Sequence, residues 1–158
     1  MTLRYVIGDA TAPQGAGPGV IVHVCNDVGG WGRGFVLALS WRWPEPERRY
    51  RAWYRGEEPT PFALGAVQFV AVEDGLCVAN LIGQRDVRSR GGGPPVRYEA
   101  IREGLRAVAV FAREQGASVH MPRIGAGLAG GSWETISVII EEELAVHGVE
   151  VTVYDLPE

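Results

Sequence analysis

The sequence contains no lysine, because all 15 of its basic residues are arginine. A lysine amine can act as a nucleophile once its pKa is lowered, whereas an arginine guanidinium stays protonated in proteins. Any mechanism that forms a covalent adduct through a lysine amine is therefore excluded. Arginine still allows phosphate to be bound.

Cysteine and positive charge are also scarce. The only cysteines, Cys25 and Cys77, lie inside apolar runs and have neither the pattern of a disulfide framework nor the spacing of a zinc site. We expect both thiols to be buried and reduced, and we expect no metal and no other cofactor. The net charge of −4 at pH 7 argues against general nucleic-acid binding, which relies on an excess of positive charge.

Long hydrophobic runs are absent as well. No apolar run approaches the roughly 18 residues of a membrane-spanning helix, and residues 1–5 lack the pattern of a signal peptide. These absences predict a cytoplasmic protein with no membrane partner. A chain of 158 residues with 46% hydrophobic content is expected to form one globular domain, residues 1–158.

Strand-like and helix-like stretches alternate along the chain, which predicts an α/β sandwich. Residues 66–73 alternate as expected of an edge or antiparallel strand, whereas residues 20–25 suit a strand buried on both faces. The predicted strands are residues 3–7, 20–25, 66–73, 76–82, a stretch that begins at Val119, and 150–154. The predicted helices are residues 35–42, one beginning near Pro44 and Pro46, 96–115, and one capped by Ser132 that runs up to Gly148.

The most informative stretch is residues 119–133, where an apolar strand passes through glycines into a predicted helix. Glycine readily takes positive φ and lets backbone N–H groups approach an anion, and the N-terminal end of the helix adds positive partial charge. The stretch is therefore suited to a diphosphate, although a tight turn without a ligand gives the same pattern. Its glycines are Gly125, Gly127, Gly130 and Gly131.

Further polar and glycine-rich segments follow other predicted strands. Asp9, with Ala10 beside it, follows the first strand, and its carboxylate suits either an adenine amine or simple turn chemistry. A second glycine-rich loop, residues 26–35, leads into a helix-like stretch. Because both glycine-rich loops leave the carboxyl ends of strands, we expect a ligand crevice along one rim of the sheet.

Other segments have plainer interpretations. Residues 41–55 interleave aromatic residues with arginines, which can bind nucleic acid, but Pro44 and Pro46 favour an amphipathic helix with its aromatic face inward. His23 is interpreted as a hydrogen-bonded core residue rather than a base. Residues 83–96 are expected to form a long surface loop. This loop carries Gln84, Arg85, Arg88 and Arg90.

Together these motifs resemble a macro domain. The likeness rests on residues 8–9, 26–35, 122–128 and 151–155, and it spans nearly the whole chain. Residues 121–128, followed by Trp133 and Glu134, most resemble the branch that contains the terminal ADP-ribose protein glycohydrolase and the remodeller-associated macro domain. The resemblance implies a three-layer α/β/α sandwich with a mixed central sheet.

The resemblance also implies an ADP-ribose pocket. Asp9 would bind the adenine amine, Ala10 beside it would also contact the ligand, and Tyr154 would lie near the adenine. The 124–128 segment would bind the diphosphate, and the second loop would bind the distal ribose and the other phosphate face. The implied diphosphate residues are Ile124, Gly125, Ala126, Gly127 and Leu128, and those of the second loop are Gly30, Trp31, Gly32, Arg33, Gly34 and Phe35.

The chain departs from the glycohydrolase at two implied positions. In that enzyme a lysine lies after the strand that precedes the long loop, and it forms an adduct with the opened ribose. An aspartate after the Gly-x-Gly-Leu motif assists. Here these two positions are Gln84 and Ala129. A water-mediated reaction remains open. Asn26 would orient the ribose hydroxyls or the water, and Gln84 or Asp27 would assist, although Asp27 equally suits a capping or turn role.

Three functions remain open. The first is a hydrolase that removes ADP-ribose from acidic side chains or another ester-like attachment, since an ester at the ribose is an activated leaving group. The second is a non-catalytic reader, and the third is a phosphatase acting on ADP-ribose with a terminal phosphate. We rank them in this order, because a free-standing domain of bacterial character has little reason merely to read a mark. The expected partners are ADP-ribose and ADP-ribosylated proteins, with ADP-ribosylated nucleic acid as a further candidate.

Overall fold

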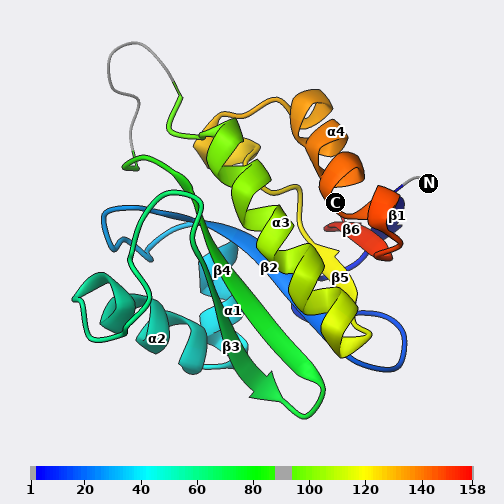
Figure 1. Cartoon of the computed structure of the whole chain (residues 1–158), viewed down its shortest axis with the longest axis horizontal. Coiled ribbons are helices and arrows are strands. Elements are labelled where there is room, and N and C mark those ends of the chain that lie inside the picture. The colour runs from blue at the N-terminus through cyan, green and yellow to red at the C-terminus, as the bar shows by residue number, and fades with distance from the viewer. Residues whose placement is uncertain (1–2, 88–93, 158) are drawn as a thin grey trace.

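The computed structural model describes residues 3–87 and 94–157. Strands and helices alternate as the sequence predicts, and the first helix has the predicted bounds (Figure 1). The strands are β1 (Arg4–Ile7), β2 (Gly19–Asn26), β3 (Val67–Glu73), β4 (Leu76–Gln84), β5 (Ser118–Met121) and β6 (Val151–Asp155). The α-helices are α1 (Phe35–Arg42), α2 (Glu45–Tyr54), α3 (Tyr98–Gln115) and α4 (Trp133–Glu143), and the 3₁₀ turns are η1 (Gly127–Ala129) and η2 (Ala145–His147).

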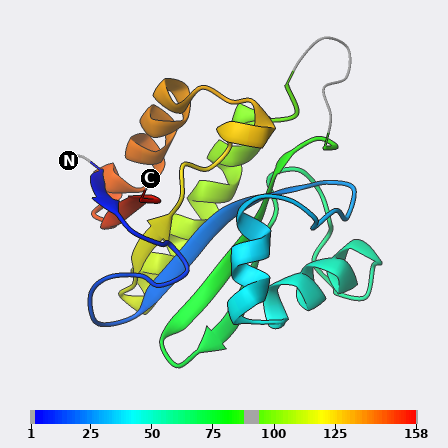
Figure 2. The same cartoon turned by 180° about the vertical axis from the view of Figure 1, so that it is seen from behind.

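The strands form a mixed sheet in the order β1-β6-β5-β2-β4-β3. Neighbouring strands from β1 to β4 are parallel, and β3 pairs antiparallel with β4 at one edge. Helices α3 and α4 cover one face (Figure 1), and α1 and α2 cover the other (Figure 2). The predicted three-layer α/β/α sandwich with a mixed sheet is confirmed.

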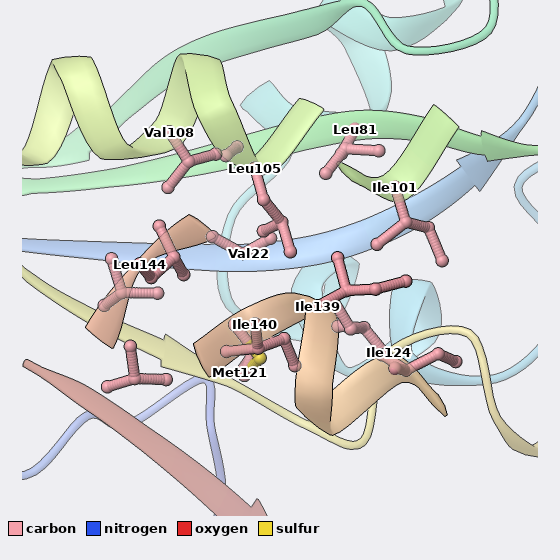
Figure 3. Close-up of a cluster of buried hydrophobic side chains, with 14 of the residues drawn as sticks. Val22, Leu81, Ile101, Leu105, Val108, Met121, Ile124, Ile139, Ile140 and Leu144 are labelled. Atoms are coloured by element: carbon pink, nitrogen blue, oxygen red, sulfur yellow. The ribbon is translucent and has the colours of Figure 1, made fainter. Parts of the chain in front are cut away.

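Strand β2 divides the core between the two faces of the sheet. Val20 and Val22 belong to the cluster under α3 and α4, whereas Ile21 and Cys25 belong to the cluster under α1 and α2. Successive side chains point to opposite faces, so a strand buried on both faces must be apolar throughout. Figure 3 shows the first cluster, in which Ile124 from the loop after β5 meets side chains of the helices and the central strands.

The predicted surface loop at residues 83–96 begins later than expected. Gly83 and Gln84 belong to β4, and Gln84 pairs with Asn26 of β2. A Cβ atom at position 83 would lie 2.9 Å from Ile101 Cγ1, so this glycine allows α3 to approach the strand closely and does not mark a turn. Arg85 is exposed, whereas Arg88 and Arg90 lie outside the described residues.

Three other predictions need smaller corrections. The helix after Ser132 ends at Glu143 and continues only as the turn η2, rather than reaching Gly148 as an α-helix. The amphipathic helix α2 is confirmed, but Tyr54 at its end is half exposed. Cys25 is buried as predicted, whereas Cys77 is only half-buried; both are free thiols.

Candidate functional site

The carboxyl ends of the parallel strands all point to the same end of the sheet, across the strands rather than along the outermost strand. We call this end the rim. Asp9 follows β1, Tyr154 lies near the end of β6, and the 124–131 segment follows β5. Asn26 ends β2 and Gln84 ends β4, the neighbouring strand. The chain topology therefore brings the predicted site residues to a shared rim, as expected for ligand sites of open α/β sheets.

The 124–131 segment, hereafter the cradle, has the backbone geometry that its glycines allow. Gly125, Gly127 and Gly130 have φ values of 73°, 58° and 75°, whereas Gly131 does not take positive φ. The Gly131 N–H donates to the Gly125 carbonyl at 2.8 Å and closes the segment. Within residues 3–87 and 94–157, the N–H groups of Gly125 and Gly127 make no hydrogen bond. Among the described residues, nothing therefore competes with an anion for these two donors.

The cradle is anchored on its inner side and open on its outer side. Ile124 is buried in the core, and a Cβ atom at Gly125 would lie 2.8 Å from Ile136 Cδ1. At Gly127 a Cβ atom would have no neighbour within 4 Å. Ala126 is half-buried, and the side chain of Leu128 lies outside the described part of the structure.

The side chain of Asn26 organises the second loop. Its Oδ1 accepts hydrogen bonds from the N–H groups of Val28 at 3.0 Å and Gly30 at 2.9 Å, and its Nδ2 donates to the Gly30 carbonyl at 2.9 Å. Helix α1 then begins after Gly34, where no side chain caps the helix. The first N–H groups of α1 therefore face the rim with their positive partial charge uncompensated by a cap.

The other predicted residues of the second loop divide into two groups. Trp31 is buried and donates its Nε1–H to Ser40 Oγ at 2.8 Å, so its ring belongs to the core. Gly32 and Arg33 are exposed, and Phe35 is half-buried. A role for Trp31 in binding can thus involve its backbone rather than its ring.

Helix α2 supports this loop, a role that the sequence did not suggest. The Tyr50 hydroxyl donates to the backbone carbonyl of Asn26, and Arg51 donates to the carbonyl of Gly29 at 3.0 Å. Gly29 has φ 76°, and a Cβ atom there would lie 2.5 Å from the Tyr54 ring. Tyr50, Arg51 and Tyr54 of α2 therefore position the second loop.

Asp27 and Gln84 converge on a third polar residue, Asp86. Asp27 Oδ1 accepts the Asp86 N–H at 2.7 Å, and Gln84 Nε2 donates to the Asp86 carbonyl at 2.9 Å. Asp86 has φ 64°, and no other non-glycine residue in the described ranges has positive φ. Backbone strain of this kind concentrates at functional sites. Sequence reasoning missed Asp86, and an aspartate in a loop rich in glycine and arginine carries no signal of such a backbone.

At the opposite end of the rim, Asp9 takes part in a turn. Its Oδ1 accepts from the Thr11 N–H at 2.8 Å and the Thr11 hydroxyl at 2.7 Å, and its Oδ2 lies 3.8 Å from an Arg42 nitrogen. Ala10 is buried. The turn interpretation of Asp9 is therefore confirmed, while its contact with adenine stays a prediction. Tyr154 is also buried, and its hydroxyl accepts the Gln14 N–H at 2.8 Å.

Two buried titratable groups of the core, His23 and Cys25, are held in their neutral forms. Burial lowers the pKa of His23 to about 4, against the raising effect of its hydrogen bond with Asn80. Burial raises the pKa of the Cys25 thiol. His23 is thus a neutral, hydrogen-bonded core residue, as predicted, and Cys25 stays protonated.

Two cavities of the structure lie away from the cradle and the second loop. Cavities of about 610 Å³ and 320 Å³ are lined, among the described residues, by neither the cradle nor the second loop. In the ranges that the structure covers, no three His, Cys, Asp or Glu side chains are grouped to hold a metal ion. No helix of the described chain is long and apolar enough to cross a membrane.

Known structures share this fold over nearly the whole chain. A protein of unknown function from Bacteroides thetaiotaomicron is 57% identical, with a TM-score of 0.95 and 99% of each chain covered. A macrodomain protein from Streptomyces coelicolor is 55% identical, with a TM-score of 0.85, covering 97% of this chain and 98% of that one. No family model matches the sequence.

Curated relatives carry several activities in their names. A zebrafish chromodomain-helicase-DNA-binding protein 1-like is 34% identical over 96% of this chain, but the chain spans only 15% of that protein and 18% of its mouse counterpart. A DNA ADP-ribosyl glycohydrolase from Thermus aquaticus is 30% identical, covering 97% of this chain and 41% of that protein. An ADP-ribose 1''-phosphate phosphatase from Chaetomium globosum is 31% identical, with 87% and 84% covered. The chain belongs to the macrodomain family.

Proposed function

We propose that the protein binds ADP-ribose along the rim and hydrolyses the bond between its distal ribose and a modified target, with an ester of an acidic side chain as the first candidate linkage. The observation that carries this proposal is the cradle, in which the N–H groups of Gly125 and Gly127 make no hydrogen bond within the described chain. Open space around the Gly127 position leaves room for the phosphates. A preformed set of N–H donors is what a diphosphate requires.

The order of the strands supports an extended ligand along the rim, because Asp9 follows β1 at one end, the cradle follows β5, and the second loop follows β2. Asp9 and Ala10 would contact the adenine, the cradle would hold the diphosphate, and the second loop would hold the distal ribose. The uncapped N-terminus of α1 supports binding of the second phosphate face. The glycohydrolase and phosphatase relatives are named for reactions on ADP-ribose or ADP-ribosyl groups, which supports the same ligand class.

In the proposed reaction, water takes the place of a lysine nucleophile. An amide nitrogen carries two protons, and Asn26 donates one of them to Gly30. The other can be donated to a ribose hydroxyl. If water attacks the anomeric carbon, the bond from that carbon to the ester oxygen breaks, the acid leaves as a carboxylate, and the water proton passes to the carboxylate of Asp27 or Asp86. If water attacks the ester carbonyl carbon, the acyl–oxygen bond breaks, and the departing ribose oxygen takes the proton that the same carboxylate accepted from the water. Gln84 would orient the water without accepting its proton.

The test is a panel of defined substrates. ADP-ribose linked to a glutamate peptide, a serine peptide and an oligonucleotide would each be incubated with the protein, and free ADP-ribose would be measured. We expect release from the glutamate ester, and we expect Gly127→Glu to slow this release at low substrate concentration because it weakens binding. Release from the oligonucleotide alone would show that the proposed ester linkage is wrong, while the proposal that the protein is a hydrolase would stand.

A non-catalytic reader is the second candidate, and one observation favours it. Asn26 Oδ1 accepts hydrogen bonds from the N–H groups of Val28 and Gly30 and lies 2.9 Å from the Tyr50 hydroxyl donor, so this oxygen is committed to holding the loop. Tight ADP-ribose binding without release from any linkage would establish the reader in place of the hydrolase. Adding ADP-ribose 1''-phosphate to the panel tests the third candidate, the phosphatase.

A further inference from the structure

The residues that flank the cradle touch each other through side chains. Arg123 immediately precedes the cradle, and Trp133, the first residue of α4, follows it closely. The guanidinium carbon of Arg123 lies 5.2 Å from the centroid of the Trp133 ring and 5.2 Å from that of Tyr5 in β1. The same guanidinium donates two hydrogen bonds to the carboxylate of Asp155, at 2.7 and 3.0 Å. We call these four residues the clasp.

The clasp ties both ends of the cradle to neighbouring strands of the sheet. Tyr5 lies in β1 and Asp155 ends β6, and these strands are paired. The Trp133 indole donates to the Tyr5 hydroxyl at 3.1 Å, and the two rings meet edge to face at 6.4 Å. Together with the Gly131-to-Gly125 backbone bond inside the cradle, these contacts fix the distance between the cradle's ends.

We propose that the clasp positions the cradle for diphosphate binding, so that Arg123 acts on the ligand through the loop rather than by direct contact. This inference rests on the proposed function. A glycine-rich segment left unconstrained would have to be ordered by the ligand, and that entropy cost would weaken binding. With its ends fixed, the N–H donors are already in place when the phosphates arrive.

The chemistry of Arg123 explains why this residue suits the task. A planar guanidinium can stack on aromatic rings and bind a carboxylate with two parallel hydrogen bonds at once, which a lysine ammonium cannot do. The hydrogen bonds from Arg123 also lower the pKa of Asp155 below its ordinary value, so the ion pair persists to a lower pH than an unpaired aspartate would allow. The pair therefore stays intact where the protein would act.

A rival explanation is that Arg123 attracts the diphosphate by its charge alone. The two explanations make opposite predictions for Asp155→Asn. Removing this negative charge should leave binding of an anionic ligand unchanged or stronger if simple attraction operates. If the clasp operates, the same change loosens Arg123 and weakens binding. Arg123→Lys also distinguishes the two explanations. It keeps the positive charge but loses the two parallel hydrogen bonds to Asp155 and the stacking of the guanidinium on the aromatic rings.

The experiment measures ADP-ribose and adenosine affinities by calorimetry for the wild type, Asp155→Asn, Arg123→Lys and Arg123→Ala. The matched control is Arg55→Lys, because Arg55 also binds a carboxylate with two hydrogen bonds, to Glu57 at 2.6 and 3.2 Å, at the end of α2. All three clasp variants should bind ADP-ribose about tenfold more weakly. This loss is expected if the cradle keeps its binding-competent conformation in only about a tenth of the protein molecules. Adenosine, which lacks phosphate, should change by less than about twofold, and the control should match the wild type.

Hydrogen exchange of the cradle amides provides a readout that needs no ligand. The clasp variants should exchange faster at the hydrogen-bonded amides of the cradle, those of Ala126, Ala129, Gly130 and Gly131, with rates elsewhere unchanged. Unchanged hydrogen exchange together with wild-type ADP-ribose affinity in Asp155→Asn would overturn the proposal that the clasp positions the cradle. Failure of the wild type to bind ADP-ribose would instead refute the proposed function. Faster exchange in such a protein would keep the clasp as a device that orders the cradle and overturn its link to diphosphate.

Discussion

Replacing Gly127 with glutamate should eliminate tight ADP-ribose binding while leaving the fold intact. A Cβ atom at this position meets no other atom within 4 Å, so the side chain would project into the space proposed for the diphosphate. The structural cost is limited to the strain of positive φ, about 1–2 kcal/mol. Gly148 offers a matched control, because it has φ 83°, equally open space around its Cβ, and a place at the opposite edge of the sheet.

The magnitude follows from charge repulsion at short range. Two unit charges about 4 Å apart interact with about 1 kcal/mol in bulk water and about 4 kcal/mol at the effective dielectric constant of a protein surface. Gly127→Glu should therefore weaken ADP-ribose binding by roughly 5- to 1,000-fold. Gly127→Gln has nearly the same bulk without the charge, so its loss should be smaller, and the difference isolates the electrostatic part.

The assay is calorimetric titration with ADP-ribose, accompanied by thermal unfolding of each variant. Gly127→Glu and Gly148→Glu should show similar falls in melting temperature, because both introduce strain at a positive φ. Only the Gly127 variant should lose affinity. Wild-type affinity in Gly127→Glu, or an equal loss in Gly148→Glu, would refute the location of the diphosphate.

Three further predictions concern other parts of the molecule. Asp9→Ala should weaken ADP-ribose by about 1.5–3 kcal/mol in calorimetry, the range for a hydrogen bond to a charged group, and should spare ribose phosphate; equal losses would leave Asp9 only its turn role. Asn26→Ala should slow release by roughly one to three orders of magnitude and also weaken binding, because its amide holds Gly30 in place; unimpaired binding would contradict that structural role. His23, with its pKa lowered to about 4, stays neutral in the fold while the unfolded chain takes up a proton near pH 6.5. Its contribution to stability is therefore complete above that pH and falls by about 2 kcal/mol between pH 7 and 5, and urea unfolding of His23→Gln should lack this slope.

Local patterns in the sequence predicted most of the elements. The apolar run of β2 indicated a strand buried on both faces. The helix predicted for residues 96–115 ends at Gln115 as expected, where Gly116 takes φ 62°. The glycines of the cradle also indicated its backbone, since Gly125 and Gly127 take positive φ. Such features depend on neighbouring residues alone, which is why they can be inferred without coordinates.

Contacts between distant segments could not be predicted in the same way. Tyr5 and Trp133 lie 128 residues apart, and nothing in either segment indicates that one arginine contacts both. Gly83 was interpreted as the start of a loop, although it makes room for α3 beside β4. The position of Asp86 likewise depends on Asp27, 59 residues away. These parts of the site are set by tertiary packing rather than by local propensity.

In the mechanism that we propose, water cleaves the bond to the distal ribose without a covalent enzyme intermediate. The most direct test is turnover of a glutamate-linked ADP-ribosyl substrate in isotopically labelled water, with a reductant added to trap any adduct. The absence of lysine leads us to expect an unchanged protein mass and label in one product, either ADP-ribose or the freed acid, according to which bond breaks. A protein mass increased by a trapped ADP-ribosyl group, or products without label, would contradict the account.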